Sequence, residues 1–457
     1  MRTKIGVIIM KADDDRRYLS THPWITLGFK MDRLSPATWA LLGEAAAKCE
    51  HLAGSAMPPE FAEELNQVSL ERGAHGTASI EGNSLSEEDV RAIVRGESRI
   101  PPSRAYQKQE IENIVDLFND IARDCLEGHP APLSPERLKE QHARLMVGQP
   151  EKEGVVPGEF RTHDVVVGRY RGAPPEDCDY LVRRLCDWLN GELEDLGGSD
   201  DVLRDPRVFV LAALAHLHLA WIHPFGDGNG RISRLLEFEI LLRASIPVPA
   251  AHLLSDHYNK TRDHYCAILE RTSRADGYPM EDFVHYATEG LVDGLREQLQ
   301  KVRDMQMTIM WQSYVHERFH GQHTPARTRM RDVVLFLPPG EWTAPDDIVM
   351  LSKDINDAYR GKTSKTISRD INALESMGLV EKRRGRGCDP ASRSWPPSCR
   401  PGASSEPFSS GKVRAGRLED QLRATRLGDR PRLPCLRMRR VPDLKSRYML
   451  DQSSSPV

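Results

Sequence analysis

Apolar residues recur every three or four positions along most of the chain, and this spacing predicts a largely helical protein. The segment 206–221 is apolar on nearly every side, so we expect it to lie in the core. Two helix starts are marked by capping residues: Ser84, with the acidic turn that follows it, and Ser134, followed by Pro135. Further predicted helices cover residues 39–49, 59–72, 106–125, 180–190, 231–243, 256–269 and 280–319.

One segment breaks the helical pattern. Val165, Val166 and Val167 form a β-branched run that Gly168 follows, and this pattern predicts a short hairpin. The fold class predicted for the larger part of the chain is therefore all-α, with one short β-hairpin.

Smaller elements follow a predicted linker over residues 321–327. Helices are predicted at 329–336, 352–359 and 364–377, with a further short segment at 343–349 and a strand at 379–384. Together these elements indicate a small winged helix-turn-helix domain. From about residue 385 the chain is rich in Arg, Pro, Ser and Gly, so we expect a disordered tail. This tail interrupts the wing where its second strand should return.

The chain of 457 residues is 39% hydrophobic and 28% charged, which is typical of a soluble globular protein with two or three domains. The predicted plan has an N-terminal extension (1–34), a helical region (35–105), a helical core (106–320), the winged helix-turn-helix (328–386) and a disordered basic tail (387–457).

Net charge, apolar runs and cysteine spacing indicate which partners and which cell compartment to expect. The formal net charge of −4 gives no global attraction to nucleic acid. No apolar run approaches the ~20 residues of a membrane span, and the first ten residues make a poor signal peptide. The eight cysteines are scattered without zinc-ligand spacing, which favours free thiols in a reducing compartment. We therefore predict a cytoplasmic protein with no membrane partner.

The segment from His223 to Arg234 reads His-Pro-Phe-Gly-Asp-Gly-Asn-Gly-Arg-Ile-Ser-Arg. Three glycines at alternate positions let the backbone N–H groups turn inward, at the start of a helix whose dipole favours an anion. Arg231 and Arg234 lie three apart on that helix and add positive charge. Asp227 is a hard oxygen ligand suited to a divalent ion, and His223 titrates near neutral pH.

These residues together predict a phosphate-binding loop with a metal ligand and a base, suited to attack of a hydroxyl on a nucleotide phosphorus. The alternative is a glycine-rich surface turn with solvated arginines. We favour the phosphate loop because the His, Asp, Asn and both Arg residues occur together. The chain has no Gly-x-x-x-x-Gly-Lys-Ser/Thr motif, which argues against an ordinary P-loop enzyme.

The same segment resembles the signature of the Fic family, His-x-Phe-x-(Asp/Glu)-Gly-Asn-Gly-Arg-x-x-Arg, at every fixed position, and a looser resemblance covers residues 39–319. The resemblance implies a Fic-type helical bundle that transfers AMP from ATP to a protein hydroxyl, with Mg²⁺ as cofactor. It implies that His223 is the base, that Phe225 anchors the loop and that Asp227 holds magnesium. The residues implied to bind the nucleotide phosphates are Gly228, Asn229, Gly230, Arg231 and Arg234.

The predicted hairpin also has a counterpart in this family. The resemblance implies that Val165, Val166 and Val167 form a flap that pins an extended target segment by strand-like pairing. An ordinary surface hairpin fits the same residues equally well.

A second string, Thr77-Ala-Ser-Ile-Glu81-Gly82, resembles the family's inhibitory motif, Ser/Thr-x-x-x-Glu-(Gly/Asn). Thr77 and Glu81 are four apart and so share one face of a helix. The Glu81 carboxylate can pair with Arg234, which the γ-phosphate of ATP would need. A solvated glutamate before a turn is the alternative, and the complete loop signature favours the inhibitory role. In some relatives the same glutamate serves the reverse removal of AMP.

Residues 363–378 have the pattern of a recognition helix. The predicted DNA contacts are Ser364, Lys365, Thr366 and Arg369, near the N-terminal end of this helix. The domain resembles winged-helix modules attached to bacterial Fic proteins, and such modules also serve in protein interaction.

Three functional interpretations stay open. The favoured one is an autoinhibited AMP transferase that modifies an unnamed protein and itself. The second is a DNA-binding transcriptional regulator that uses the Fic core as a nucleotide sensor. The third keeps the enzyme but changes its cargo to another nucleotide, a phosphate or a phosphocholine. The resemblance is also compatible with a homodimer through the surface near the inhibitory helix.

Overall fold

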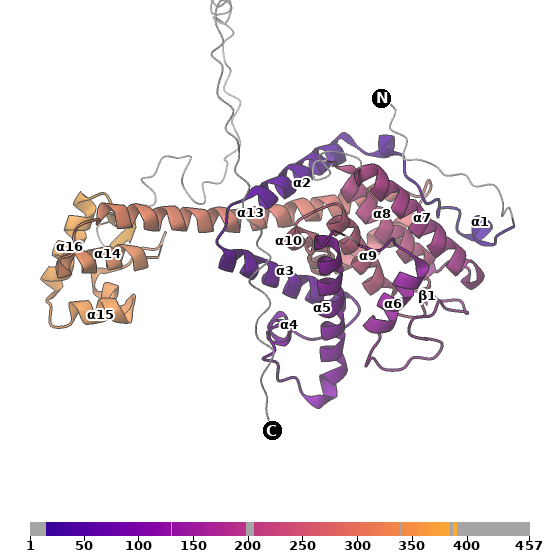
Figure 1. Ribbon diagram of the computed structural model, residues 1–457, viewed down its shortest axis with the longest axis horizontal. Coiled ribbons are helices and arrows are strands. Elements are labelled where there is room, and N and C mark those ends of the chain that lie inside the picture. The colour runs from indigo at the N-terminus through magenta and orange to yellow at the C-terminus, as the bar shows by residue number, and fades with distance from the viewer. Residues whose placement is uncertain (1–14, 129, 198–204, 339, 384–386, 391–457) are drawn as a thin grey trace, which may run out of the picture. The chain divides into compact units, whose positions relative to one another are not determined.

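Helices form nearly all of the regular structure in the computed structural model, which describes residues 15–128, 130–197, 205–338, 340–383 and 387–390 (Figure 1). Strands β1 (Val166–Val167) and β2 (Tyr170–Arg171) pair antiparallel as a hairpin. The predicted helical fold with one short hairpin is therefore confirmed. The helices of this part are α1 (Tyr18–Thr21), α2 (Pro36–Gly54), α3 (Pro59–Ile80), α4 (Glu87–Val94), α5 (Ala105–Leu126), α6 (Pro135–Leu145), α7 (Cys178–Gly197), α8 (Arg207–Ile222), α9 (Asn229–Arg243), α10 (Val248–Ala251), α11 (Leu253–Lys260), α12 (Arg262–Arg274) and α13 (Met280–Arg318).

Helices α8 and α9 pack against each other at the centre of the hydrophobic core. Between Val208 and Ile222 every residue of α8 is buried except the half-buried Ala220, as expected for a helix that is apolar on all sides. Every residue of α9 from Arg231 to Leu242 is buried as well. The loop that joins the two helices is therefore fixed at both ends by the core.

Two glycines bring α3 close to α11. A Cβ at Gly76 would lie 2.5 Å from the backbone carbonyl oxygen of Ser255, and a Cβ at Gly73 would lie 2.6 Å from the ring of His252. Glycine alone fits at this spacing, because larger residues would force the helices apart. This close contact fixes the end of α3, where Glu81 follows Ile80.

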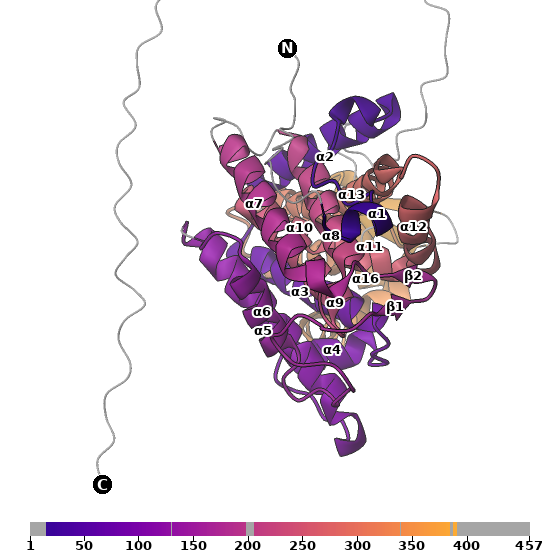
Figure 2. The same ribbon diagram turned by 90° about the vertical axis from the view of Figure 1, so that its right-hand side faces the viewer.

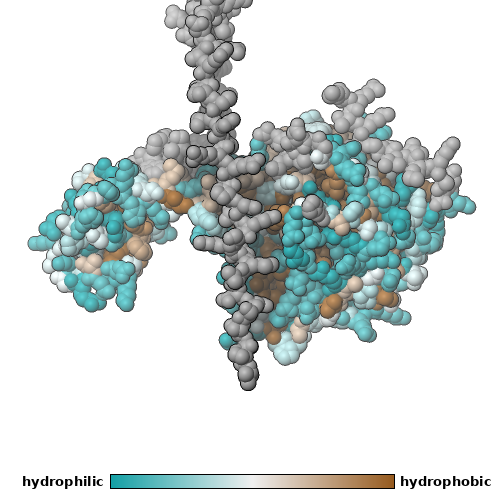
Figure 3. Space-filling view, viewed as in Figure 1, coloured by the Kyte–Doolittle hydropathy of each residue, from teal (hydrophilic) through white to brown (hydrophobic). Residues whose placement is uncertain are grey.

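Polar residues make up most of the face of the bundle that Figure 3 shows. Within the described ranges, no helix combines the length and the apolar composition that crossing a membrane requires.

The C-terminal elements form a second, smaller core that includes Val333, Ile355 and Leu374. Asp370 in this core accepts hydrogen bonds from the guanidinium of Arg329 (2.7 and 2.8 Å) and from the hydroxyl of Tyr359 (3.1 Å). The elements are α14 (Pro325–Phe336), a 3-10 helix (Pro345–Met350), α15 (Lys353–Tyr359), α16 (Ser364–Ser376), β3 (Val380–Arg383) and β4 (Gly387–Pro390).

The predicted interruption of the wing is wrong, because β4 returns antiparallel to β3, with Glu381 opposite Asp389. The cause is that residues 387–390, assigned to the tail for lack of apolar periodicity, form a strand too short to show such periodicity. Residues 391–457, the rest of the predicted tail, lie outside the described residues, as do residues 1–14 of the predicted N-terminal extension.

Two local predictions also differ from the structure. The helix predicted over 256–269 is two helices, α11 and α12, divided at Thr261, whose hydroxyl donates to the carbonyl of His257 (2.8 Å). The cap of α4 is Ser86 rather than Ser84, because the Ser86 hydroxyl accepts from the N–H of Asp89 in a capping box. The predicted start at Ser134 and Pro135 is confirmed for α6.

Candidate active site

The loop between α8 and α9 is held by bonds within its own backbone. Helix α8 ends at His223, whose φ of 52° is left-handed, and Gly228 has a φ of 79° just before α9. Asn229 accepts from the N–H of Phe225 at 2.9 Å and donates to the carbonyl of Phe225 at 2.8 Å. The Phe225 ring is fully buried and ties the loop to the core.

His142 on α6 contacts the loop and supports it, and no sequence pattern had indicated this role. Its ring stacks on Phe225, with ring centroids 3.9 Å apart and an interplanar angle of 8°. Its Nε2 lies 3.0 Å from the carbonyl of Asp227, and its Nδ1 accepts from the N–H of Gly158 at 3.0 Å. A carbonyl can only accept, so Nε2 carries the proton. Burial lowers the pKa of His142 to about 4, which keeps the ring neutral.

His223 is placed as a neutral imidazole with one free nitrogen. Its Nδ1 lies 3.2 Å from the carbonyl of Ala220, so Nδ1 carries the proton and Nε2 is the acceptor. Burial lowers the pKa of His223 to about 4. The buried Arg161 donates to the backbone carbonyls of His223 (2.7 Å), Ile222 (3.4 Å) and Ala173. The end of α8 is therefore rigid where the imidazole begins.

Asp227 faces positive charge on two sides. Its Oδ2 lies 2.7 Å from Nζ of Lys152 and 3.3 Å from Nη2 of Arg231. Burial alone would raise the pKa of the Asp227 carboxyl, but Lys152 and Arg231 outweigh burial and lower that pKa. The described part of the chain holds no group of three or more His, Cys, Asp or Glu residues suited to a metal. Asp227 fits Mg²⁺ as a single carboxylate ligand, since this ion commonly takes its other ligands from phosphates and water.

Arg231 is also held from α5. Its Nη1 donates to Oε1 of the buried Glu110, a partner that the sequence did not reveal. Oε2 of Glu110 accepts from the side chain of Asn83 at 2.9 Å. Asn83 follows Gly82, whose φ of 100° turns the chain after α3. The turn beside Glu81 is thereby connected to one of the two arginines of the loop.

Glu81 and Arg234 form an ion pair at the centre of the site. Nη2 of Arg234 donates to Oε1 of Glu81 at 2.7 Å and to the backbone carbonyl of Thr77 at 2.9 Å. The side chain of Arg234 is fully buried, whereas that of Glu81 is 28% exposed. Burial would raise the pKa of Glu81, but Arg234 outweighs burial and lowers it. A Cβ at Gly230 would collide with Oε1 of Glu81, so the carboxylate lies directly over the loop.

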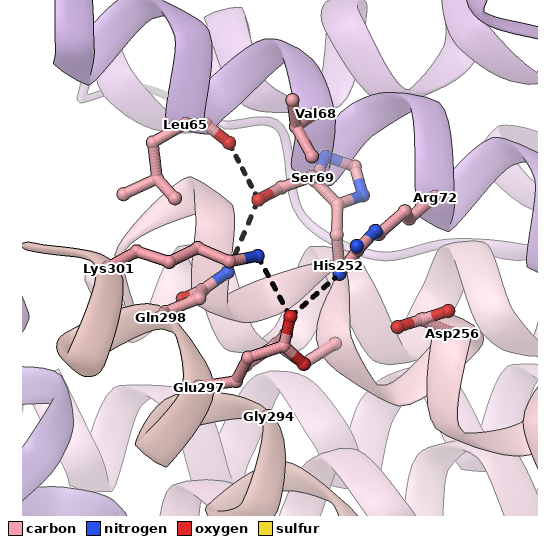
Figure 4. A pocket seen from close by; sticks show the side chains of 11 residues that line it. Leu65, Val68, Ser69, Arg72, His252, Asp256, Gly294, Glu297, Gln298 and Lys301 are labelled. Atoms are coloured by element: carbon pink, nitrogen blue, oxygen red, sulfur yellow. Dashed lines mark hydrogen bonds and ion pairs between the residues drawn. The ribbon is translucent and has the colours of Figure 1, made fainter. Parts of the chain in front are cut away.

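Polar contacts to α13 keep α3 in this position (Figure 4). The Ser69 hydroxyl accepts from Nε2 of Gln298 at 3.2 Å, and Arg72 pairs with Glu297 at 3.2 Å. A pocket lies here between α3, α11 and α13, and none of the predicted site residues lines it. The pocket is therefore distinct from the site at His223.

The hairpin adjoins His223. A Cβ at Gly172 would lie 3.0 Å from Cβ of His223. Figure 2 shows α12 beside the hairpin, and Arg169 in the turn pairs with Glu270 on α12 at 3.1 Å. The side chains predicted to dock the target are partly solvent-facing, with Val166 59% and Val167 54% exposed.

The residues predicted to contact DNA lie on α16. Ser364, Lys365 and Arg369 are exposed and Thr366 is half-buried. Residues 325–390 contain twelve basic and ten acidic residues, so the C-terminal domain has no strong excess of positive charge.

Comparison with known proteins identifies the region that carries this loop. Residues 132–241 match the model of the Fic/DOC family. Over 213 residues the chain is 30% identical to protein adenylyltransferase fic-1 of Caenorhabditis elegans, a span of 47% of this chain and 38% of that protein. Over 276 residues it is 27% identical to protein adenylyltransferase Fic of Drosophila erecta, a span of 59% of this chain and 50% of that protein.

The chain thus matches half or less of the length of these relatives. Among solved structures, it is similar to a Fic family protein from Desulfovibrio desulfuricans G20, with 21% identity, a TM-score of 0.46, and coverage of 77% of this chain and 92% of that one. Fic-1 from Caenorhabditis elegans shows 20% identity and a TM-score of 0.46, with coverage of 58% and 73%.

Proposed function

We propose that this chain transfers AMP from ATP to a hydroxyl of a target protein, and that Glu81 keeps the transferase inhibited. The observation that carries the proposal is the Glu81–Arg234 ion pair over the loop of the region that matches the Fic/DOC family. Relatives at about 30% identity are protein adenylyltransferases, which supports the same reaction class.

His223 would act as the base. Its unprotonated Nε2 takes the proton of the target hydroxyl as that oxygen attacks the α-phosphorus of ATP. The bond from the α-phosphorus to the oxygen that bridges to the β-phosphorus breaks, and pyrophosphate leaves. The rigid backbone around His223 supports this role, because such a reaction depends mainly on positioning.

The N-terminus of α9 and its two arginines would hold the phosphates. The N–H groups of Gly228, Asn229 and Gly230 lie at the positive end of the helix dipole. Arg231 and Arg234 supply fixed charge for the β- and γ-phosphates. Asp227 would hold Mg²⁺, which neutralises phosphate charge when it is bound.

The inhibition follows from occupancy of Arg234. The Glu81 carboxylate accepts a hydrogen bond from Nη2 of Arg234. It also lies over Gly230, where a phosphate oxygen would approach the loop. A carboxylate and a phosphate are both anions, so they compete for one guanidinium and repel each other. ATP would then bind without the contacts that align its α-phosphorus. The same glutamate could position water for removal of AMP, and self-modification by the active form is also expected.

The hairpin would receive the target, because it adjoins His223 and presents exposed residues. Transfer of another nucleotide, a phosphate or a phosphocholine is the enzymatic alternative, and labelled donors distinguish these cargoes.

The regulator interpretation depends on α16 alone. Its N-terminal half exposes Lys365 and Arg369, but the nearly balanced charge of the surrounding domain gives weak long-range attraction to DNA. We therefore retain DNA contact as a secondary role, and a homodimer as a further proposal.

The test uses purified Glu81→Gly protein with Mg²⁺ and ATP labelled at either the α- or the γ-phosphate. Covalent label from the α-phosphate alone, lost in Glu81→Gly/His223→Ala, establishes AMP transfer. Label from the γ-phosphate would make the protein a kinase instead. Absence of label from both would favour the regulator.

A further inference from the structure

The N-terminal segment, residues 15–34, packs beside the hairpin although it is far from it in sequence. The N–H of Tyr18 donates to Oδ2 of Asp177 at 2.8 Å, and the guanidinium of Arg16 lies 3.7 Å from the ring centroid of Tyr180. Four apolar residues of the segment are buried in the main core: Ile25, Leu27, Phe29 and Leu34. The segment is therefore an integral part of the fold around the hairpin.

His22 closes one edge of the hairpin. Its Nε2 lies 2.9 Å from the backbone carbonyl of Arg171, so Nε2 carries the proton and donates. Its Nδ1 lies 2.8 Å from the hydroxyl oxygen of Thr21. His22 is buried, and Trp24 packs near it against Tyr170, with ring centroids 6.4 Å apart. Burial lowers the pKa of His22, which keeps this donor neutral.

The strand register shows which edge remains open. The N–H of Gly172 donates to the carbonyl of Val165 at 3.1 Å, so the next pair along the ladder, Val166 and Arg171, is a non-hydrogen-bonded pair. The N–H and C=O groups of such a pair point away from the partner strand. On β2, the outward carbonyl of Arg171 accepts a hydrogen bond from His22. On β1, the outward N–H and C=O of Val166 lie on the opposite edge of the hairpin.

We propose that the N-terminal segment, through His22 and Trp24, closes the β2 edge and directs an extended target polypeptide to the β1 edge beside Val166. This inference rests on the proposed function, since the target must bring a hydroxyl to His223. The base of the hairpin, where Gly172 pairs with Val165, adjoins His223, so one end of a strand added along β1 would lie near that histidine. Backbone pairing supplies the affinity and tolerates varied target side chains.

Amide hydrogen exchange tests whether the segment holds the hairpin. In His22→Ala/Trp24→Ala, we expect the amides of residues 165–172 to exchange about fivefold faster, because a hydrogen bond contributes about 1 kcal/mol and about 1.4 kcal/mol corresponds to a factor of ten. Ser20→Ala, an exposed change in the same segment, serves as the matched control, and the amides of α8 serve as an internal reference. His22→Gln should retain part of the protection, because its amide can donate to the same carbonyl. Unchanged exchange at residues 165–172 in the double variant overturns the proposal.

Two proline variants in the Glu81→Gly background test the choice of edge. Val166→Pro removes the outward N–H of residue 166 on β1, and Arg171→Pro removes the outward N–H of residue 171 on β2. Neither of these N–H groups forms a hydrogen bond within the hairpin. We expect Val166→Pro to lower labelling of lysate proteins from α-labelled ATP about tenfold and Arg171→Pro to lower it less than threefold. The reverse order, or equal loss, overturns docking at β1. If Glu81→Gly labels nothing, the proposed function fails and docking with it, while hydrogen exchange still decides whether the segment holds the hairpin.

Discussion

Oε1 of Glu81 lies 2.7 Å from Nη2 of Arg234, and this contact joins the end of α3 to the second turn of α9. A hydrogen bond between charged groups contributes about 1.5–3 kcal/mol. A γ-phosphate that uses Arg234 must break this bond first, which corresponds to a factor of about 10–100 in an equilibrium constant. The inhibition proposed here needs no further element.

Glu81→Gly should raise affinity for ATP more than affinity for ADP. ADP has no γ-phosphate, so it gains less when Arg234 is released. We expect ATP to bind about 10–100-fold more tightly to the variant than to the parent, by calorimetry in the presence of Mg²⁺. Arg234→Ala in the same background should cancel the gain. Equal gains for ATP and ADP would mean that Glu81 acts on another part of the nucleotide.

Gly76→Ala should release part of the inhibition from a distance. The added Cβ would lie 2.5 Å from the carbonyl of Ser255, so α3 must move away from α11 and carry Glu81 with it. Overpacking of this kind costs about 1–3 kcal/mol of stability. We expect a lower unfolding temperature together with faster AMP transfer than in the parent. Gly43→Ala, on α2 in open space, is the matched control. It should raise the unfolding temperature slightly, because alanine favours a helix over glycine, and leave the rate of AMP transfer unchanged. Loss of stability without any gain in transfer would argue against the helix position as the determinant.

The pH profile of Glu81→Gly should lack an acid limb near pH 6.5. Burial lowers the pKa of His223 to about 4, so the ring loses its capacity as a base only when pH falls toward that value. The value of kcat/KM should therefore stay level between pH 8 and pH 6. The parent should remain inhibited over the same range, because Arg234 also lowers the pKa of Glu81 and keeps it ionised. A fall in kcat/KM centred near pH 6.5 would show that His223 titrates like a solvent-exposed histidine.

His142→Ala should weaken both the fold and the nucleotide site. The change removes the ring stacked on Phe225 and leaves the carbonyl of Asp227 and the N–H of Gly158 without their partner. We expect the free energy of unfolding to fall by about 2–5 kcal/mol, as measured by denaturant unfolding. His51→Ala, on the exposed side of α2, is the control. If His142→Ala unfolds like the parent and binds ATP equally well, the loop does not depend on this histidine.

The loop of residues 223–234 and the segment of residues 77–82 could be singled out from sequence because each is a continuous stretch of chain. Residues 223–234 are consecutive, and Thr77 and Glu81 share a helical face, so local spacing places their side chains. The pairing of Glu81 with Arg234 crosses 153 residues, and it was predicted only because both strings resemble family motifs. Helix spacing supplied the core in the same way, since α8 is apolar on every side.

Contacts made by single residues from distant segments left no local pattern. His142 and Glu110 support the loop from α6 and α5, and each looks like an ordinary polar residue on an amphipathic helix. His22 meets the hairpin through one backbone carbonyl, 149 residues away. The break at Thr261 depends on a hydroxyl bond to a helix carbonyl, which helical periodicity does not reveal.

The most direct test of the account compares the initial rate of covalent labelling from α-labelled ATP in three proteins: the parent, Glu81→Gly, and Glu81→Gly/Arg234→Ala. The account predicts slow labelling in the parent, labelling about 10–100-fold faster in Glu81→Gly, and loss of that gain when Arg234 is also removed. Equal labelling rates in the parent and Glu81→Gly would contradict the proposal that the Glu81–Arg234 pair restrains AMP transfer.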